Sequence, residues 1–329
     1  MRVHFVLPED DQPSGGNLYD RRAVAGLVAL GLDVRETALA GPWPQPDERA
    51  RGRLDDALAA TPDGSAVLLD GLVACGVPEV VEAHAHRLRT AVLLHLPLAA
   101  ETGLSPETAA RLDAAERRTL RAAELVLATS PEAARVLDHP RVRTAVPGTD
   151  PAPVAHGTDG KSRLLCVASL TPRKGQDLLL RALDDLPLSC DLVGPERDSE
   201  HARQLRAHGL GERIRVRGAM TPPELDDVYA TADLLVQPSR AETYGMAVTE
   251  ALARGIPVIA SAVPDALGDG GLLLPPGDLD ALTDALRRWS TDPGFREELR
   301  ASALHRRTQL PTWEATAQQL ASALTSLDA

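Results

Sequence analysis

The chain has 329 residues, of which 43% are hydrophobic, 25% are charged and only 2% are aromatic. This is about twice the length of a typical domain, so the sequence predicts two domains with aliphatic cores. The formal net charge of −12 is shared between both halves, which argues against a nucleic-acid partner and allows at most a peripheral membrane contact.

The chain carries no apolar run close to the ~20 residues of a membrane-spanning helix, and its first residues lead directly into a strand pattern without the layout of a signal peptide. We therefore expect a cytoplasmic protein. The three cysteines fit no metal-binding spacing. Cys166 and Cys190 lie in apolar runs and are expected to be buried free thiols.

In the first half, short apolar runs alternate with amphipathic stretches. The runs predict strands at 3–7, 66–69, 90–94, 125–128 and 142–146. The stretches predict helices, chiefly over 17–30 and 106–122. This alternation is typical of an open parallel sheet with helices on both faces.

Residues 147–160 are rich in Pro, Gly and Asp and have no apolar period, which predicts a linker between domains. The alternation then resumes, with strands expected at 164–168, 191–193, 214–217, 234–237 and 258–260. The predicted fold class is α/β, with two doubly wound Rossmann-like domains facing each other across a cleft. Ligands of such sheets bind at the carboxyl ends of strands, so the loops after residues 7, 168, 193, 217 and 237 are the informative ones.

The loop after the first strand of the second half contains Arg173, Lys174 and Gly175, and a helix is expected to begin there. Two cations beside a helix N-terminus form a good anion site, because the helix dipole and the backbone N–H groups add to their charge. The alternative is a surface turn with solvated charges.

A second segment, 237–258, follows a predicted strand and enters a helix. Glu242 lies in its loop, and Glu250 lies eight positions later on the helix. Carboxylates at these places can accept hydrogen bonds from sugar and ribose hydroxyls. Between them, the amides of Gly245, Met246 and Ala247 are expected to point at an anion.

The run Pro238-Ser-x-x-Glu242-x-Tyr-Gly245-x-x-x-x-Glu250-Ala-Leu-Ala-x-Gly-Ile-Pro-Val258 resembles the E-x7-E signature of retaining family-4 glycosyltransferases, which have the GT-B fold. Arg173-Lys-Gly175 resembles the diphosphate loop of that family, and Leu192-Val-Gly194 resembles its next glycine turn. The match is looser in the first half, where Pro13-Ser-Gly-Gly-Asn17 and His95-Leu-Pro-Leu98 are similar to active-site segments. Trp313-Glu314 resembles the closing helix of the family.

The resemblance implies three domain segments: an acceptor domain over 1–150, a donor domain over 151–310, and a helix over 311–329 that packs back on the first domain. It also implies a metal-independent transferase that moves a sugar, with retention, from a UDP- or GDP-linked donor. Lys174 and Arg173 would neutralise the diphosphate, Glu242 would bind the sugar, and His95 would touch donor or acceptor. The other implied donor contacts are Gly15, Gly16, Ser169, Gly194, Met220, Tyr244, Gly245, Met246, Ala247 and Glu250.

One position departs from the family. A second Arg is usual five residues before the diphosphate Lys, and this chain has Ser169 there. Loss of a charge-assisted hydrogen bond would weaken diphosphate binding unless Arg173 compensates. The departure keeps one alternative open, a nucleotide-sugar binding protein without transfer activity. A second alternative, which does not depend on Ser169, is a GT-B nucleotide-sugar epimerase or hydrolase that uses the same cleft.

No metal or organic cofactor is expected. Asp278-Leu-Asp280 has the spacing of a metal motif, but the helix pattern that follows favours helix capping. Glu9, Asp10 and Asp11 lack a partner histidine, and neither a G-x-G-x-x-G turn nor a P-loop is present. The acceptor is open among small molecules, saccharides and lipids, and the sequence indicates no oligomeric state.

Overall fold

The computed structural model describes residues 1–329 except 10–13, 102, 209–210 and 328–329. The chain divides into two compact units. Unit 1 contains residues 1–148 and 311–329, and unit 2 contains residues 149–310. The connecting residues around 147–160 form no helix or strand.

Unit 1 is built on a sheet of six parallel strands: β1 (Arg2–Pro8), β2 (Asp33–Leu39), β3 (Ala66–Asp70), β4 (Arg89–Leu94), β5 (Leu125–Ala128) and β6 (Val142–Thr144). Their order in the sheet is β2-β1-β3-β4-β5-β6. The inner strand β3 is buried along its whole length. Its residues are aliphatic up to a final aspartate, as expected for a strand covered on both faces.

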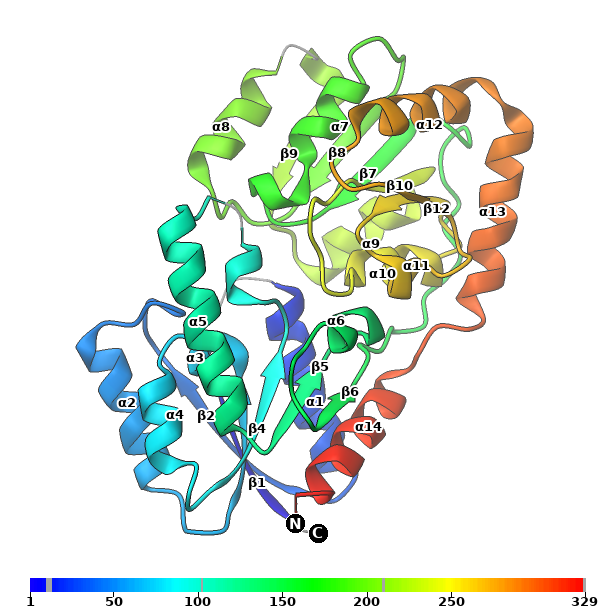
Figure 1. The fold of residues 1–329 in the computed structure, drawn as a ribbon. Coiled ribbons are helices and arrows are strands. Elements are labelled where there is room, and N and C mark those ends of the chain that lie inside the picture. The colour runs from blue at the N-terminus through cyan, green and yellow to red at the C-terminus, as the bar shows by residue number, and fades with distance from the viewer. Residues whose placement is uncertain (10–13, 102, 209–210, 328–329) are drawn as a thin grey trace. The chain divides into compact units, whose positions relative to one another are not determined.

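Helices cover both faces of this sheet (Figure 1): α1 (Gly15–Ala29), α2 (Glu48–Ala59), α3 (Gly71–Ala74), α4 (Pro78–His84), α5 (Pro106–Ala122), α6 (Pro131–Arg135) and α14 (Trp313–Thr325), with a 3₁₀ turn at Leu98–Ala100. Side chains of a strand alternate between faces. Val67 and Leu69 therefore pack with α2, α4 and α5, whereas Leu68 packs with α1 and α14. The last helix, α14, lies against α1.

Unit 2 has a second parallel sheet of six strands: β7 (Arg163–Val167), β8 (Ser189–Val193), β9 (Ile214–Gly218), β10 (Leu234–Gln237), β11 (Val258–Ser261) and β12 (Leu272–Leu274). Their order is β12-β11-β10-β7-β8-β9. This is the Rossmann strand order, in which the direction of winding reverses between the first and the fourth strand of the sheet, here β7 and β10.

The helices of unit 2 are α7 (Gln176–Ala182), α8 (Ser199–Ala207), α9 (Pro222–Ala230), α10 (Met246–Ala253), α11 (Pro264–Leu267), α12 (Leu279–Thr291) and α13 (Pro293–Arg307), with 3₁₀ turns at Pro172–Lys174 and Gly211–Arg213. The main core, around the fully buried Trp289, lies between the sheet and α7, α8 and α12. The Asp278 carboxylate accepts the N–H of Ala281 at 2.9 Å and caps α12, which confirms the capping interpretation.

The α/β class and the two doubly wound sheets are confirmed, and the expected strands are all present to within two residues. Two edge strands, β2 and β12, were not predicted. All three cysteines are buried and free. Within the described part of the chain, no helix combines the length and apolarity needed to cross a membrane.

Candidate functional site

The winding reversal of unit 2 brings two predicted loops together. The loop after β7 carries Arg173 and Lys174, and the loop after β10 carries Glu242. Lys174 Nζ donates a hydrogen bond to Glu242 Oε1. Arg173 lies 3.7 Å from the other carboxylate oxygen and donates to the carbonyl oxygen of Ala241 at 3.1 Å. The two cations and the carboxylate thus form one cluster at the switch point, where doubly wound sheets bind ligands.

The Glu242 side chain is only 10% exposed, yet it remains ionised. Burial alone would raise its pKa, but the charges of Lys174 and Arg173 and a 3.1 Å hydrogen bond from the Ser239 hydroxyl hold the pKa below its usual value. Two cations, Lys174 and Arg173, thus lie beside this carboxylate, and cationic side chains suit a phosphate ligand.

Two glycines shape the backbone of this site. Gly175 has φ +69°, and a Cβ there would lie 2.0 Å from the carbonyl oxygen of Pro238, so the two loops approach too closely for any side chain. Gly245 has φ +101° and is the N-cap of α10. The first N–H groups of a helix have no partner within it. Those of Met246 and Ala247 are therefore at the place where the sequence predicts an anion.

The second predicted carboxylate, Glu250, lies on α10 and meets a residue that the sequence did not single out. The hydroxyl of Tyr229, on α9, donates to Glu250 Oε2 at 2.8 Å. Burial raises the pKa of Glu250 despite this hydrogen bond and the nearby charge of Arg254. The guanidinium of Arg254 lies 4.5 Å above the Tyr229 ring. Tyr229 lies outside the motif run, so only the fold reveals this contact.

Other predicted donor contacts surround the same sheet edge. Ser169 accepts a hydrogen bond from the Gln176 amide through its backbone oxygen, at 2.9 Å. A Cβ on Gly194, which has φ +149°, would lie 2.1 Å from the Ala168 oxygen. Met220 is half-buried after β9. The Tyr244 side chain is 4% exposed and belongs to the core.

Unit 1 holds a second cluster, at its own winding reversal between β1 and β3. His95, which follows β4, lies with Nε2 2.9 Å from Asp20 Oδ1 on α1 and 3.3 Å from Asp70 Oδ2 at the end of β3. Asp70 also accepts the N–H of Leu72 at 2.6 Å through its other oxygen. The three side chains have the spacing of a possible metal site, but their hydrogen bonds are already explained by an imidazolium between two carboxylates.

The charges in this cluster support that assignment. Burial disfavours a charged imidazole, but the two carboxylates outweigh it and raise the pKa of His95 to about 10. Burial, together with the charge of Asp70, raises the pKa of Asp20 to about 6 although His95 opposes the shift. The sequence predicted a role for His95 without identifying either aspartate as its partner.

The glycine loop of unit 1 leads into this cluster. Gly15 and Gly16 are the first residues of α1, which Ser14 caps by accepting the N–H of Asn17 at 3.1 Å. A Cβ on Gly16 would lie 3.6 Å from the ring of His95. Asp10, Asp11 and Pro13, which the sequence analysis named, lie outside the described residues.

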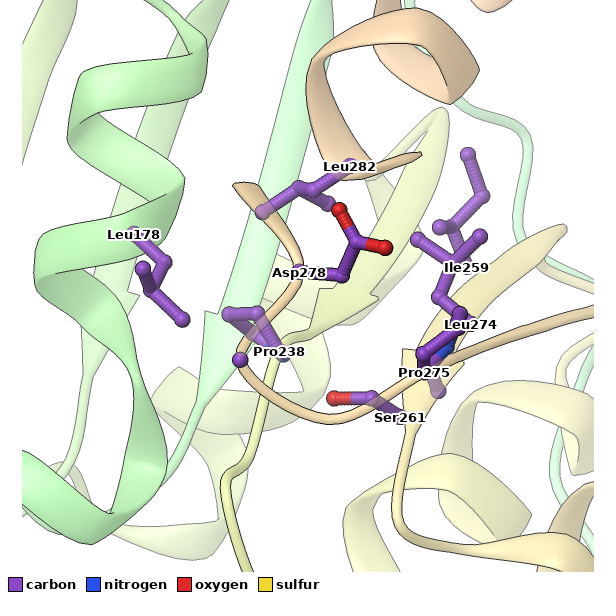
Figure 2. A pocket seen from close by; sticks show the side chains of 10 residues that line it. Leu178, Pro238, Ile259, Ser261, Leu274, Pro275, Asp278 and Leu282 are labelled. Carbon is purple, nitrogen blue, oxygen red and sulfur yellow. The ribbon is translucent and has the colours of Figure 1, made fainter. Parts of the chain in front are cut away.

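A hollow of about 240 Å³, including open solvent, lies beside β11 and β12 in unit 2 (Figure 2). Its lining is mostly aliphatic, with Leu178, Ile259 and Leu282 around the carboxylate of Asp278. That carboxylate already caps α12, and Ser261 donates to the Ser239 oxygen at 2.7 Å. The hollow has no cation in its lining and does not suit a diphosphate.

Residues 152–306, within unit 2, match the family model described as Glycosyl transferases group 1. A D-inositol 3-phosphate glycosyltransferase from Kribbella flavida is 33% identical over an alignment 250 residues long, which covers 65% of this chain and 58% of that protein. The enzyme of the same name from a Nocardioides species is 31% identical over an alignment 287 residues long, which covers 74% of this chain and 61% of that protein. The chain thus spans about three fifths of the length of these relatives.

Solved structures share the fold over the whole chain. Sucrose-phosphate synthase from Thermosynechococcus elongatus has a TM-score of 0.82 at 22% identity and covers 100% of this chain and 99% of its own. HepE of Anabaena, solved in complex with UDP-glucose, has a TM-score of 0.76 at 18% identity, with 99% and 100% covered. At such low identity the likeness concerns the fold alone.

Proposed function

We propose that this chain is a glycosyltransferase that takes a sugar from a nucleotide diphosphate and holds that donor in unit 2. The observation that carries the proposal is the cluster of Arg173, Lys174 and Glu242 at the winding reversal of the second sheet. The same part of the chain matches the group 1 glycosyl transferase model, which supports the proposal.

The donor diphosphate binds between the two cations and the N-terminus of α10. Lys174 and Arg173 supply positive charge, and the amides of Met246 and Ala247 supply N–H donors. When the phosphates bind Lys174, its ion pair with Glu242 is released, and the Glu242 carboxylate accepts hydrogen bonds from the hydroxyls of the sugar. Glu250, oriented by Tyr229, accepts from the ribose.

UDP is the first nucleotide to test, because HepE, a protein of the same fold, has been solved with UDP-glucose. GDP is the second. The loop around Gly194 follows β8, which neighbours β7 in the sheet, and the loop around Met220 follows β9, the strand beyond β8. We assign the nucleobase to these two loops.

Transfer proceeds with retention and without a metal ion. An acceptor hydroxyl attacks the anomeric carbon from the face that carries the diphosphate, the bond from that carbon to the phosphate oxygen breaks, and the hydroxyl proton passes to a phosphate oxygen of the leaving group. Fixed cations and helix-end amides stabilise the leaving diphosphate. Activity should therefore survive EDTA. Glu242 and Glu250 do not act as an acid–base pair, because each has its own ligand.

We assign the acceptor to unit 1. His95 is held by Asp20 and Asp70 through Nε2, and among the described residues no partner contacts its Nδ1. An imidazolium so held offers one N–H to an oxygen of the donor or acceptor. A panel of candidate acceptors should contain small molecules, saccharides and lipids. It should also contain D-inositol 3-phosphate, because the two relatives described above are named D-inositol 3-phosphate glycosyltransferases.

Calorimetry with UDP and GDP tests the donor site with a matched pair of variants. The chain has only two lysines, Lys161 and Lys174, and Lys161 is exposed. Lys174→Ala should raise the Kd of the nucleotide by roughly tenfold or more, the value of one charge-assisted hydrogen bond. Lys161→Ala should leave it unchanged. Equal affinity of both variants and the wild type would refute the assigned donor site.

A turnover assay separates this function from its alternatives. Transfer to a member of the acceptor panel supports the proposal. Consumption of UDP-sugar at the same rate without any acceptor would indicate a hydrolase or epimerase instead. Tight binding without turnover on any acceptor would indicate a binding protein, the alternative prompted by Ser169.

A further inference from the structure

Arg240 connects the two loops of the donor site, although it lies at a position that the motif leaves open. Its guanidinium donates to both carboxylate oxygens of Asp177, at 2.8 and 2.6 Å, and to the carbonyl oxygen of Pro172, at 2.5 Å. Its backbone N–H donates to the oxygen of Arg173 at 2.8 Å. One residue of the Glu242 loop thus contacts three residues of the loop and helix start that carry Lys174.

The contact is reciprocal. Arg173 donates from its side chain to the backbone oxygen of Ala241, next to Arg240. Each loop therefore holds the backbone of the other through an arginine. Because a bidentate arginine–carboxylate pair fixes both distance and orientation, these bonds determine where Lys174 lies relative to Glu242.

The positive charge of Arg240 is paired with the carboxylate of Asp177. Asp177 pairs with it through both oxygens, and the pKa of Arg240 is raised mainly by this hydrogen bond. Three of the five N–H groups of this guanidinium are used by Asp177 and Pro172, and its charge is balanced by the Asp177 carboxylate. This distinguishes it from Lys174, whose partner Glu242 has a proposed ligand of its own.

We propose that Arg240 and Asp177 form a positioning pair that sets the geometry of the diphosphate site without touching the donor. This inference rests on the proposed function. The pair fixes the 3₁₀ turn at Pro172–Lys174 against the loop 238–242. The pair thereby holds Lys174 in the orientation that binds the diphosphate. This positioning matters in a chain that has Ser169 where the family usually has a second cation.

Nucleotide affinity in a double-mutant cycle tests this pair. Arg240→Ala and Asp177→Ala should each weaken UDP binding by roughly tenfold, and the double variant should bind no more weakly than either single one. If Arg240 instead contacted the diphosphate, Asp177→Ala would bind UDP as tightly as the wild type or more tightly, which would overturn the proposal. GDP replaces UDP if only GDP binds the wild type.

A conservative variant tests geometry against charge. Arg240→Lys keeps the charge but cannot bridge two carboxylate oxygens and a carbonyl at once. It should bind UDP as weakly as Arg240→Ala; full rescue by lysine would overturn the positioning role. Arg287→Ala is the matched control, since Arg287 forms an exposed ion pair with Asp284 at 2.7 Å, and it should bind as the wild type does.

Amide hydrogen exchange gives a readout that needs no nucleotide. The backbone N–H of Lys174 donates to the oxygen of Thr171 within its own loop, and the backbone N–H of residue 240 donates to the oxygen of Arg173 in the other loop. Both amides should exchange faster in Arg240→Ala than in the wild type, and at the wild-type rate in Arg287→Ala. Circular dichroism first establishes that each variant is folded. Unchanged exchange would overturn the proposal. If the wild type bound neither UDP nor GDP, the proposed function would fail, whereas the exchange result would still decide the role of Arg240.

Discussion

Lys174 is paired with Glu242, 68 residues further along the chain. The cation proposed for the phosphates and the carboxylate proposed for the sugar therefore neutralise each other in this structure. A donor must compete with Glu242 for Lys174, and in doing so it frees Glu242 for the sugar hydroxyls. Binding of the phosphates and orientation of the sugar are thus linked through one ion pair.

Glu242→Gln separates these two effects. The glutamine cannot form the ion pair, so Lys174 becomes available and UDP should bind as tightly as to the wild type, or a few times more tightly. Transfer should slow by roughly 100-fold, because the sugar is no longer oriented. Calorimetry and a turnover assay check the two halves of this prediction. Parallel losses of UDP affinity and of transfer would contradict it.

Tyr229→Phe removes the hydroxyl that donates to Glu250. A buried carboxylate then loses its hydrogen bond, which should destabilise the protein by about 1–3 kcal/mol and raise the pKa of Glu250 further. Urea unfolding measures the loss of stability. Tyr244→Phe is the control, because the Tyr244 hydroxyl has no hydrogen-bond partner in the described part of the chain. Equal effects of the two variants would mean that the contact with Glu250 contributes nothing.

Gly175→Ala should disrupt the diphosphate loop. The new Cβ would meet the Pro238 oxygen at 2.0 Å and would also require a left-handed backbone at φ +69°. Gly277 has a similar φ of +77° with nothing within 4 Å, so Gly277→Ala costs only the ~1–2 kcal/mol of the backbone conformation. Thermal unfolding should show a clearly larger loss for Gly175→Ala, together with weaker UDP binding. Similar losses would argue against a close contact of the loops.

His95 should remain protonated well above neutral pH. Nuclear magnetic resonance should find its imidazolium up to a pH near 10, and Asp20→Asn should lower that midpoint. His4 gives an internal reference, because burial and the charge of Arg35 lower its pKa to about 4. A midpoint for His95 near the ordinary 6.5 would refute the paired arrangement.

The same shift has a consequence for stability. The folded protein binds the His95 proton more tightly than the unfolded chain does, so this contribution is complete below about pH 6.5. It is then lost progressively as the pH rises toward 10. Unfolding measured across that range should show a steeper decline for the wild type than for His95→Gln.

The sequence predicted the elements whose residues carry a clear apolar signal. It missed two of the four edge strands, β2 and β12, although it predicted the other two, β6 and β9. Most side chains of β2, such as Arg35 and Glu36, are exposed, and β12 has only three residues. β2 therefore lacks the continuous apolar run of a buried strand, whereas β12 is an apolar run but a very short one, Leu272–Leu274.

For the candidate site, the sequence singled out Lys174, Glu242, Glu250 and His95, but not Tyr229, the partner of Glu250, or Asp20, the partner of His95. Tyr229 and Asp20 come from helices far away in sequence, and no local pattern marks them. Arg240 stands at an open position of the motif, so it looks like one more surface arginine until the fold brings it to Asp177. Contacts of this kind depend on which strands are neighbours, and that information is not local.

Helix α14 has a consequence for the order in which the protein forms. Leu320 and Leu324 pack in the core of unit 1 with Phe5 and Tyr19, and Trp313 lies 5.9 Å from the Tyr19 ring. On the ribosome, residues 1–148 emerge first but lack this part of their core until all of unit 2 has been made. The half of the chain that is synthesised first is therefore the half that reaches its native packing last.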